Sequence, residues 1–247
     1  MINFFRKTRQ KFLRENRFTK YLLYAIGEII LVVIGILIAL QVNNWNINRQ
    51  IQNKEQAYLL EIRNNLQQDS LKLQLVLDFN RNKVKIVEDM LQIFIDTLTN
   101  QERYAILNKN ANNFTYYEVF DPVRIAFNNM LSAESIGLIR NNEFRKSLSE
   151  YYNYPYLDGV QNRISVLNRR VVDEHYPKFF TKEFVQNWIG FSSKMPPLSD
   201  LEIEKDNKLM SDLFGIKMII NVQNELIKNT QKQNQELMAL LNSNLKN

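Results

Sequence analysis

The chain has 247 residues, of which 45% are hydrophobic and 23% are charged, and its formal net charge is +6. This composition excludes both a disordered chain and a protein built mainly of membrane spans. The sequence contains no cysteine, which excludes disulfides, a lipoprotein anchor, thiol catalysis and sulfur-ligated metal.

The positive charge is concentrated at the N-terminus. Residues 1–20 hold seven of the 32 basic residues and one of the 26 acidic residues, which leaves 25 of each in the remainder. A charge excess confined to one short segment beside an apolar run indicates membrane topology, and we expect no nucleic-acid partner. The segment also carries aromatic residues such as Phe4 and Phe12, so it is either a topology signal alone or one that also lies on the anionic inner leaflet.

Residues 21–42 form an apolar run that predicts a transmembrane helix. At 1.5 Å per residue this run spans roughly 33 Å, enough to cross the hydrocarbon core. A cleaved signal peptide is the alternative, but the preceding basic segment is long and no A-x-A pattern precedes a cleavage point. We therefore predict an uncleaved anchor with a cytoplasmic N-terminus, a periplasmic domain over residues 43–247, and Trp45 as an interface anchor.

One acidic residue, Glu28, lies inside the predicted span. Gly35 and Ala39 follow it at helical spacing, and Gly35-x-x-x-Ala39 is a small-x-x-x-small pair that permits close helix approach. We expect this stripe to be a membrane-helix packing face, in a homo-oligomer or against another membrane-protein subunit. Two alternatives stay open: Glu28 snorkels to the interface without a partner, or it carries protons or ions.

The membrane segment is similar to that of a known family. The run Tyr24-Ala25-Ile26-Gly27-Glu28-Ile29-Ile30, continued by residues 35–41 and then Asn43-Asn44-Trp45-Asn46, resembles an uncharacterised single-span family of Gram-negative Bacteroidetes. A second similarity extends from residues 128–131 to 137–141, although the family's usual Ser-Ser-Gly turn is replaced there by Ser132 to Gly137. The resemblance implies a bacterial inner-membrane location and a mostly helical periplasmic region, and it implies no activity.

The region after the membrane segment predicts one long helix over residues 47–107. Apolar residues recur at spacings of three and four, and Asp69, Asn80 and Lys83 interrupt the stripe. A break near residues 78–82 would instead give a helical hairpin. We expect residues 108–121 to be a loop, and Asp121-Pro122 to begin a helix that runs to about Ala133.

The remaining chain predicts short helices followed by a long one. We expect Asn141 or Asn142 to cap a helix through Tyr152, Pro155 to open another, and a short helix to run from Thr181 to Ile189. Ser199-x-x-Glu202 is a candidate capping box for a final helix over residues 200–245. The prediction is an all-α fold: an elongated antiparallel bundle with a helical cap at residues 122–190. The amides of the long helices, Asn65 and Asn234 among them, are expected on solvated faces.

The sequence offers little for catalysis. His175 is the only histidine, and phosphate-binding glycine motifs and G-x-S-x-G are missing. A lone histidine is more often a surface or packing residue, so we predict no catalytic residue, metal or cofactor. We expect a non-enzymatic interaction or assembly module. Alternatives are an accessory subunit of an ion-conducting or energised complex that uses Glu28, and a periplasmic sensor with a separate cytoplasmic partner.

Overall fold

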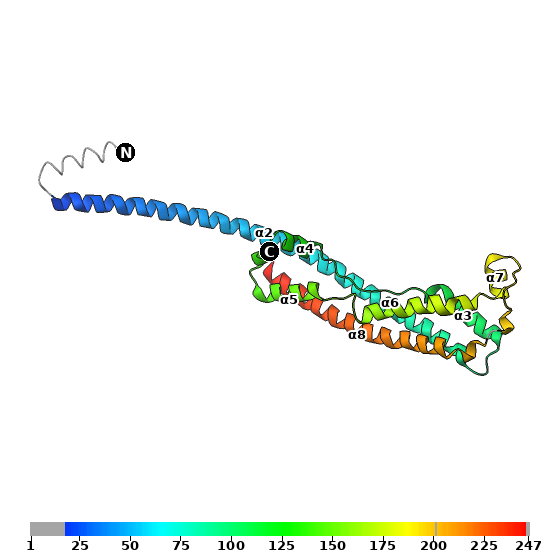
Figure 1. The fold of residues 1–247 in the computed structure, drawn as a ribbon. Helices are drawn as coiled ribbons and strands as arrows, with labels where there is room; N and C mark the ends of the chain where they lie inside the picture. Colours follow the sequence, from blue (N-terminus) through cyan, green and yellow to red (C-terminus); the bar gives the residue numbers. More distant parts are fainter. Residues whose placement is uncertain (1–17, 201, 246–247) are drawn as a thin grey trace. The chain divides into compact units, whose positions relative to one another are not determined.

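A computed structural model describes residues 18–200 and 202–245. The chain divides into two compact units, residues 1–57 and residues 58–247, and each unit is described by itself. Every regular element in the described residues is a helix, which confirms the predicted all-α class (Figure 1). The boundary between the two units, at residue 57, falls within one continuous helix.

The described part of the first unit is helical and belongs to α2, which spans Phe18–Leu91. Apolar side chains are exposed on all its sides, including Leu31, Ile34 and Leu37. This helix is long and apolar enough to cross a membrane. A helix that is apolar all round needs an apolar environment, either a protein core or a bilayer.

In the second unit, α2 continues from Tyr58 to Leu91 and no hairpin forms at residues 78–82. The predicted helix over 47–107 is nevertheless interrupted. A 3-10 turn at Gln92–Phe94 (η1) ends it, and α3 begins at Asn100 and ends at Phe114. The interruption has a local cause, because Thr99 and Glu102 form a reciprocal capping box that starts a new helix. Half of the predicted loop at 108–121 is thus helical.

The next helices are α4 (Ile125–Ser132), the 3-10 turn η2 (Ile136–Leu138) and α5 (Asn142–Asn153). Asn141 caps α5 by accepting a hydrogen bond from the Phe144 N–H, as predicted. Asp121 does not cap a helix. Its side chain pairs with Arg124 and its carbonyl accepts from the Lys72 ammonium at 3.0 Å, so the chain at this point is tied to α2 instead.

Three consecutive helical segments follow: α6 (Val160–Arg170), a π-helical turn η3 (Val171–His175) and a 3-10 turn η4 (Tyr176–Phe179). Pro155 does not open α6. The helix begins after Gly159, whose φ of 59° lies in the left-handed region that favours glycine. The short helix α7 (Lys182–Ile189) is confirmed, with Thr181 as its N-cap and Gly190 at φ 84° as its C-cap.

The last helix, α8, spans Asn207–Asn244 after the 3-10 turns η5 (Leu198–Asp200) and η6 (Ile203–Lys205). The predicted capping box at Ser199 does not form, because the Ser199 hydroxyl bonds Asp200. Asp206 caps α8 instead, by accepting from the Leu209 N–H at 3.0 Å.

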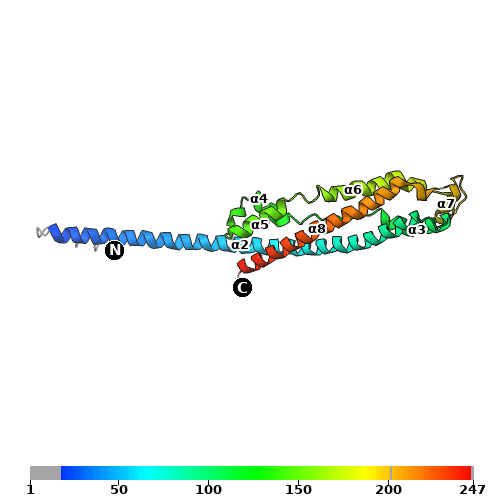
Figure 2. The ribbon, with the colours of Figure 1, turned by 90° about the horizontal axis from the view of Figure 1, so that it is seen from below.

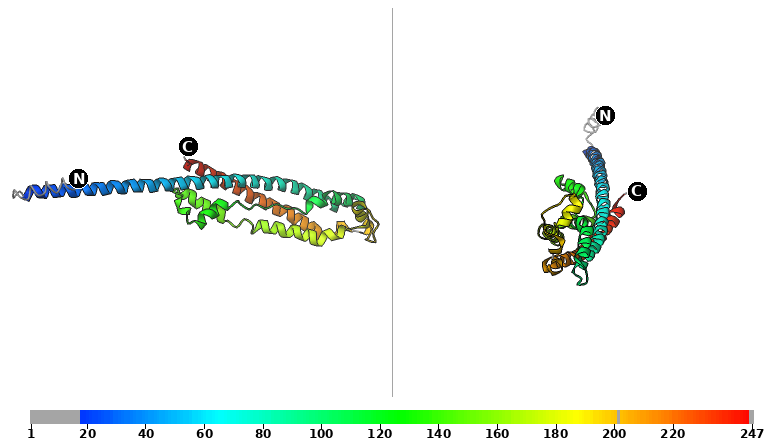
Figure 3. Two further views of the ribbon diagram at one scale, coloured as in Figure 1. Left: turned by 90° about the horizontal axis from the view of Figure 1, so that it is seen from above. Right: turned by 90° about the vertical axis from the view of Figure 1, so that its right-hand side faces the viewer.

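Within the second unit, α8 packs antiparallel to α2 (Figure 2). The residue numbers of the contacting pairs run in opposite directions along the two helices. The Leu66 carbonyl meets Asn234, Asn80 meets Gln223, and Glu88 meets Lys217. The short helices lie along this pair rather than forming one cap at residues 122–190: α4 and α5 at one end, α6 along the middle, α7 at the other end (Figures 2 and 3). The helices α5 and α6 pack their apolar side chains on α8, whereas Phe184 of α7 lies beside Tyr104 and Leu107 of α3.

Two apolar cores result. The first joins α2, α4, α5 and the end of α8, and it contains Leu66, Phe127, Tyr152 and Leu237. The second joins the end of α2 with α3, α6 and the start of α8, and it contains Val87, Leu107, Ile164 and Leu213. Polar side chains lie buried in and between these cores.

Candidate functional site

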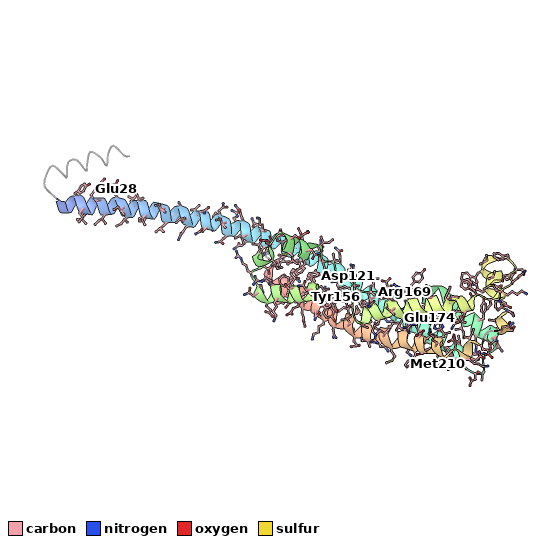
Figure 4. All side chains as sticks on the ribbon, viewed as in Figure 1. Glu28, Asp121, Tyr156, Arg169, Glu174 and Met210 are labelled. Carbon is pink, nitrogen blue, oxygen red and sulfur yellow. The ribbon has the colours of Figure 1, made fainter. Side chains whose placement is uncertain are left out.

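The predicted packing stripe of the first unit lies on an exposed part of α2. Glu28, Gly35 and Ala39 are exposed, and a Cβ built on Gly35 would meet no atom within 4 Å (Glu28 is labelled in Figure 4). Trp45 is exposed, and the Arg49 guanidinium lies 5.7 Å from its ring centroid. The stripe is therefore open to a second helix.

The second unit contains a buried polar cluster centred on Asp69 of α2. The carboxylate accepts hydrogen bonds from the Val123 N–H at 2.7 Å and from the Tyr151 hydroxyl at 3.2 Å. Asn234 of α8 donates to the Tyr151 hydroxyl and to the Leu66 carbonyl. The Asp69 cluster thus links α2, the connection before α4, α5 and α8.

Burial sets the protonation of the Asp69 cluster. It raises the pKa of Asp69 to about 6, although the hydrogen bonds from Val123 and Tyr151 oppose the rise. Burial also raises the pKa of Tyr151, Tyr152 and Tyr156 above that of a free tyrosine, and the nearby Asp69 charge adds to the rise. The three phenols consequently stay protonated at physiological pH.

A chain of amides forms a second buried cluster. Gln161 of α6 pairs with the Phe120 backbone on both sides, accepting from its N–H at 2.6 Å and donating to its carbonyl at 2.9 Å. Gln223 of α8 donates to Gln161 and to the Glu118 carbonyl, and Asn80 of α2 donates to Gln223 at 2.8 Å. These amides satisfy backbone groups of the connection at residues 115–124, which lacks secondary structure to do so.

Lys83 of α2 is a buried lysine whose ammonium contacts no carboxylate among the described residues. Its ammonium donates to the carbonyls of Phe114 and Tyr116, the latter at 2.7 Å, and lies 4.4 Å from the Phe114 ring centroid. Burial lowers the pKa of Lys83 to about 7. Because Phe114 is the last residue of α3, the ammonium caps a helix C-terminus, where positive charge is favourable.

His175, the only histidine, is fully buried in the π-helical turn. Its Nε2 lies 3.0 Å from the Asp212 carboxylate of α8, and its Nδ1 lies 3.3 Å from the Lys178 ammonium. Asp212 is also held by Arg170 at 3.2 Å. The arrangement fits the packing role predicted for a lone histidine, because the ring is fully shielded from solvent.

These clusters use their donors and acceptors to hold segments of the unit together. They join α2 to α8 and to irregular segments, and the described residues contain no group of three or more acidic or histidine side chains able to hold a metal ion. Figure 4 shows Tyr156 and Asp121 in the second unit, where the connections meet the long helices. The buried polar side chains of these clusters therefore connect the helices and the irregular segments of the second unit.

The sequence signalled part of this arrangement. Asp69, Asn80 and Lys83 occupy positions on the apolar stripe of α2, and polar residues on such a stripe are buried with it. Asn65 and Asn234 are buried too, which corrects their predicted solvent exposure. The sequence pattern did not indicate the buried polar roles of Gln161, Gln223 and Asp212. Their partners lie on backbone segments or helices that are distant in the sequence.

The structure thus defines an all-helical protein with one exposed apolar helix at its N-terminal end and a folded helical unit after it. Residues 28–181 match DUF6090, a family of unknown function, and the chain belongs to this family. Comparison with curated proteins found no match. Comparison with solved structures also found none.

Proposed function

We propose that this protein is a non-enzymatic interaction or assembly module anchored in a bacterial inner membrane. Residues 21–42 cross the bilayer, residues 1–20 lie in the cytoplasm, and the second unit lies in the periplasm. The observation that carries the proposal is the exposure of the apolar part of α2, where large side chains from Leu22 to Val42 have no covering element among residues 18–200 and 202–245.

The physical argument is one of environment. Burying a Leu, Ile or Val side chain is worth about 1.5–3 kcal/mol, so a helix with apolar residues on every side is strongly driven out of water. A bilayer supplies the required surroundings, and the helix satisfies its own backbone hydrogen bonds there. The seven basic residues before the span favour the cytoplasmic side for the N-terminus.

The interior of the second unit supports a scaffold role. Asp69, Lys83 and His175 are the ionisable groups best placed for chemistry by their environment, yet each is buried against protein partners that hold the fold. The predicted packing stripe of the first unit, which contains Gly35 and Ala39, supports assembly, because small residues allow another membrane helix to approach closely.

The test is purification of the tagged full chain in mild detergent from cells that make it natively. We expect it to co-purify with a defined set of subunits, copies of itself or other membrane proteins, in a fixed stoichiometry. Recovery of a monomer that shows no partner even after crosslinking in intact membranes contradicts the proposal. Extraction of the chain from membranes by alkaline carbonate contradicts the anchor.

A further inference from the structure

The buried histidine lies where several helical segments meet. His175 ends the π-helical turn η3, which continues α6 and leads into η4, and its ring reaches Asp212 near the start of α8. Figure 4 labels Glu174, the residue before His175. The histidine side chain has no exposed surface. A π-helical turn is rare and is found frequently at functional sites, so the contacts of this ring are of interest.

The contacts of the ring define which nitrogen carries the hydrogen. The Lys178 ammonium has only donors and lies 3.3 Å from Nδ1, so Nδ1 is the acceptor. In a neutral ring the hydrogen is then on Nε2, which donates to the Asp212 carboxylate at 3.0 Å. The geometry therefore fits the neutral Nε2–H tautomer of His175.

A second acceptor lies close to Nδ1. The Oδ2 atom of Asp206 is 3.6 Å from Nδ1 and 2.8 Å from the Lys178 ammonium. Burial opposes the ionisation of Asp206, but hydrogen bonds from Lys178 and from the Leu209 N–H hold its pKa below the ordinary value. A protonated Nδ1 therefore has an acceptor in Asp206, whereas the Lys178 ammonium cannot accept its hydrogen.

The charges around the ring limit how it can bind a proton. Charged side chains come from each neighbouring segment: Asp173 and Glu174 of η3, Arg170 of α6, Lys178 of η4, and Asp206, Lys208 and Asp212 at the start of α8. Glu174 and Lys208 pair with each other, and Asp173 is exposed. The two carboxylates at the ring, Asp206 and Asp212, are already balanced by Lys178 and Arg170.

A proton on His175 adds a positive charge to this balanced set, and a buried charge without compensation is unfavourable. Departure of Lys178 restores the balance, because its side chain is 46% exposed and its ammonium can reach solvent. A cavity of about 90 Å³, lined in part by Lys178 and Asp206, gives the ammonium room to move. Proton binding at Nδ1 and the Lys178 contact are thus alternatives.

We propose that His175 forms a pH-sensitive contact between η4 and α8, in which proton binding at Nδ1 moves this nitrogen from Lys178 to Asp206 and releases the Lys178 side chain. The release weakens the attachment of η4 to the start of α8 at acidic pH. This inference concerns the interior of the second unit, and it is independent of the proposed membrane span.

The sequence permits a direct test, since His175 is the only histidine. The full chain is made with isotope-labelled histidine, purified in detergent without a histidine tag, and titrated by NMR from about pH 8 to about pH 5. We expect ring nitrogen shifts of the Nε2–H tautomer at the alkaline end and of a doubly protonated ring at the acidic end. An Nδ1–H tautomer, or a ring that does not titrate while the chain stays folded, overturns the proposal.

Three substitutions test the groups around Nδ1. Lys178→Met should raise the midpoint of the ring titration by at least about half a pH unit, because a neighbouring cation opposes proton binding. Asp206→Asn keeps an N-cap acceptor for α8 and should lower the midpoint. The control is Lys205→Met, whose ammonium pairs with Glu202 at 2.6 Å, and it should leave the midpoint unchanged. An equal shift in both lysine variants contradicts the proposal.

Hydrogen exchange measured by mass spectrometry reports the release of Lys178. After correction for the intrinsic pH dependence of exchange, the peptide that contains residues 176–180 should exchange severalfold faster, relative to peptides from the middle of α8, once the ring is protonated. In Lys178→Met this difference should disappear, because the contact is already lost. Unchanged exchange of residues 176–180 across the ring titration shows that Lys178 stays in place, and this result overturns the proposal.

Discussion

The Tyr151 hydroxyl of α5 donates a hydrogen bond to the Asp69 carboxylate of α2 across an oxygen–oxygen distance of 3.2 Å, and Asp69 has no exposed surface. The pair joins two helices that are 82 residues apart in the chain. It also places a carboxyl group where its charge is disfavoured, which gives the stability of the fold a defined dependence on pH.

Asp69→Asn should remove that pH dependence. The folded-state pKa of Asp69, about 6, lies above the ordinary value of 3.8, so the folded protein binds more protons than the unfolded one between these values. The free energy of unfolding of the parent therefore falls as pH rises from about 4 to 6, by up to about 3 kcal/mol for this group. Denaturation of the full chain in detergent at several pH values measures the difference, with Asp78→Asn, at a half-exposed carboxylate on the same helix, as the control.

Lys83→Met should change the pH dependence of stability in the alkaline range, where the parent's stability changes with the opposite sign. Burial lowers the folded-state pKa of Lys83 to about 7, against 10.5 for a free lysine, so the unfolded protein binds more protons over this range. The free energy of unfolding of the parent should therefore rise from pH 7 to 10, and Lys83→Met should flatten that rise. The exposed Lys85→Met on the same helix should keep the parent's slope. A parent slope in the Lys83 variant contradicts the assignment.

Gln161→Leu should destabilise the second unit without changing its surface. The substitution leaves the N–H and carbonyl of Phe120 without their partner, and each buried unpaired group costs about 1–3 kcal/mol. Asn162→Leu, at the next and exposed position, is expected to cost little. Chemical denaturation compares the two, and equal stability of both variants refutes the bridging role of Gln161.

The proposed membrane topology rests on the +6 charge within residues 1–20 and can be tested directly. A reporter enzyme that is active only in the periplasm should give activity when fused after Asn247 and none when fused at Lys20. A cytoplasm-active reporter at the same two positions serves as the control and should give the reverse pattern. The opposite assignment in both experiments rejects the proposed orientation.

The membrane stripe is tested by two separate substitutions. Gly35→Leu adds bulk at the expected point of closest approach and should lower the yield of crosslinked complex severalfold. Glu28→Gln keeps the shape and hydrogen-bonding capacity of the side chain but removes titration, so assembly should survive it. Loss of function in Glu28→Gln with assembly intact indicates that Glu28 carries protons or ions. Normal assembly in both variants indicates a lipid-facing stripe.

Features that depend on neighbouring residues could be predicted from the amino-acid sequence. The apolar run at 21–42, the cap of α5 at Asn141 and the short helix between Thr181 and Gly190 all follow from side chains within a few positions. The all-α class follows from periodicity in the same way. The capping box of Thr99 and Glu102 is equally local. It was not predicted, because the apolar stripe through residues 91–98 indicated a continuous helix.

The partners of the buried polar groups depend on long-range packing. Asp69, Asn80 and Lys83 break the stripe of α2 in the sequence, but their partners Tyr151, Gln223 and the Phe114 carbonyl lie on other elements. A buried polar group must find a partner, and local sequence does not specify which distant segment supplies it. The position of the short helices along the α2–α8 pair was decided in the same way, by which long-range surfaces bury their apolar stripes together.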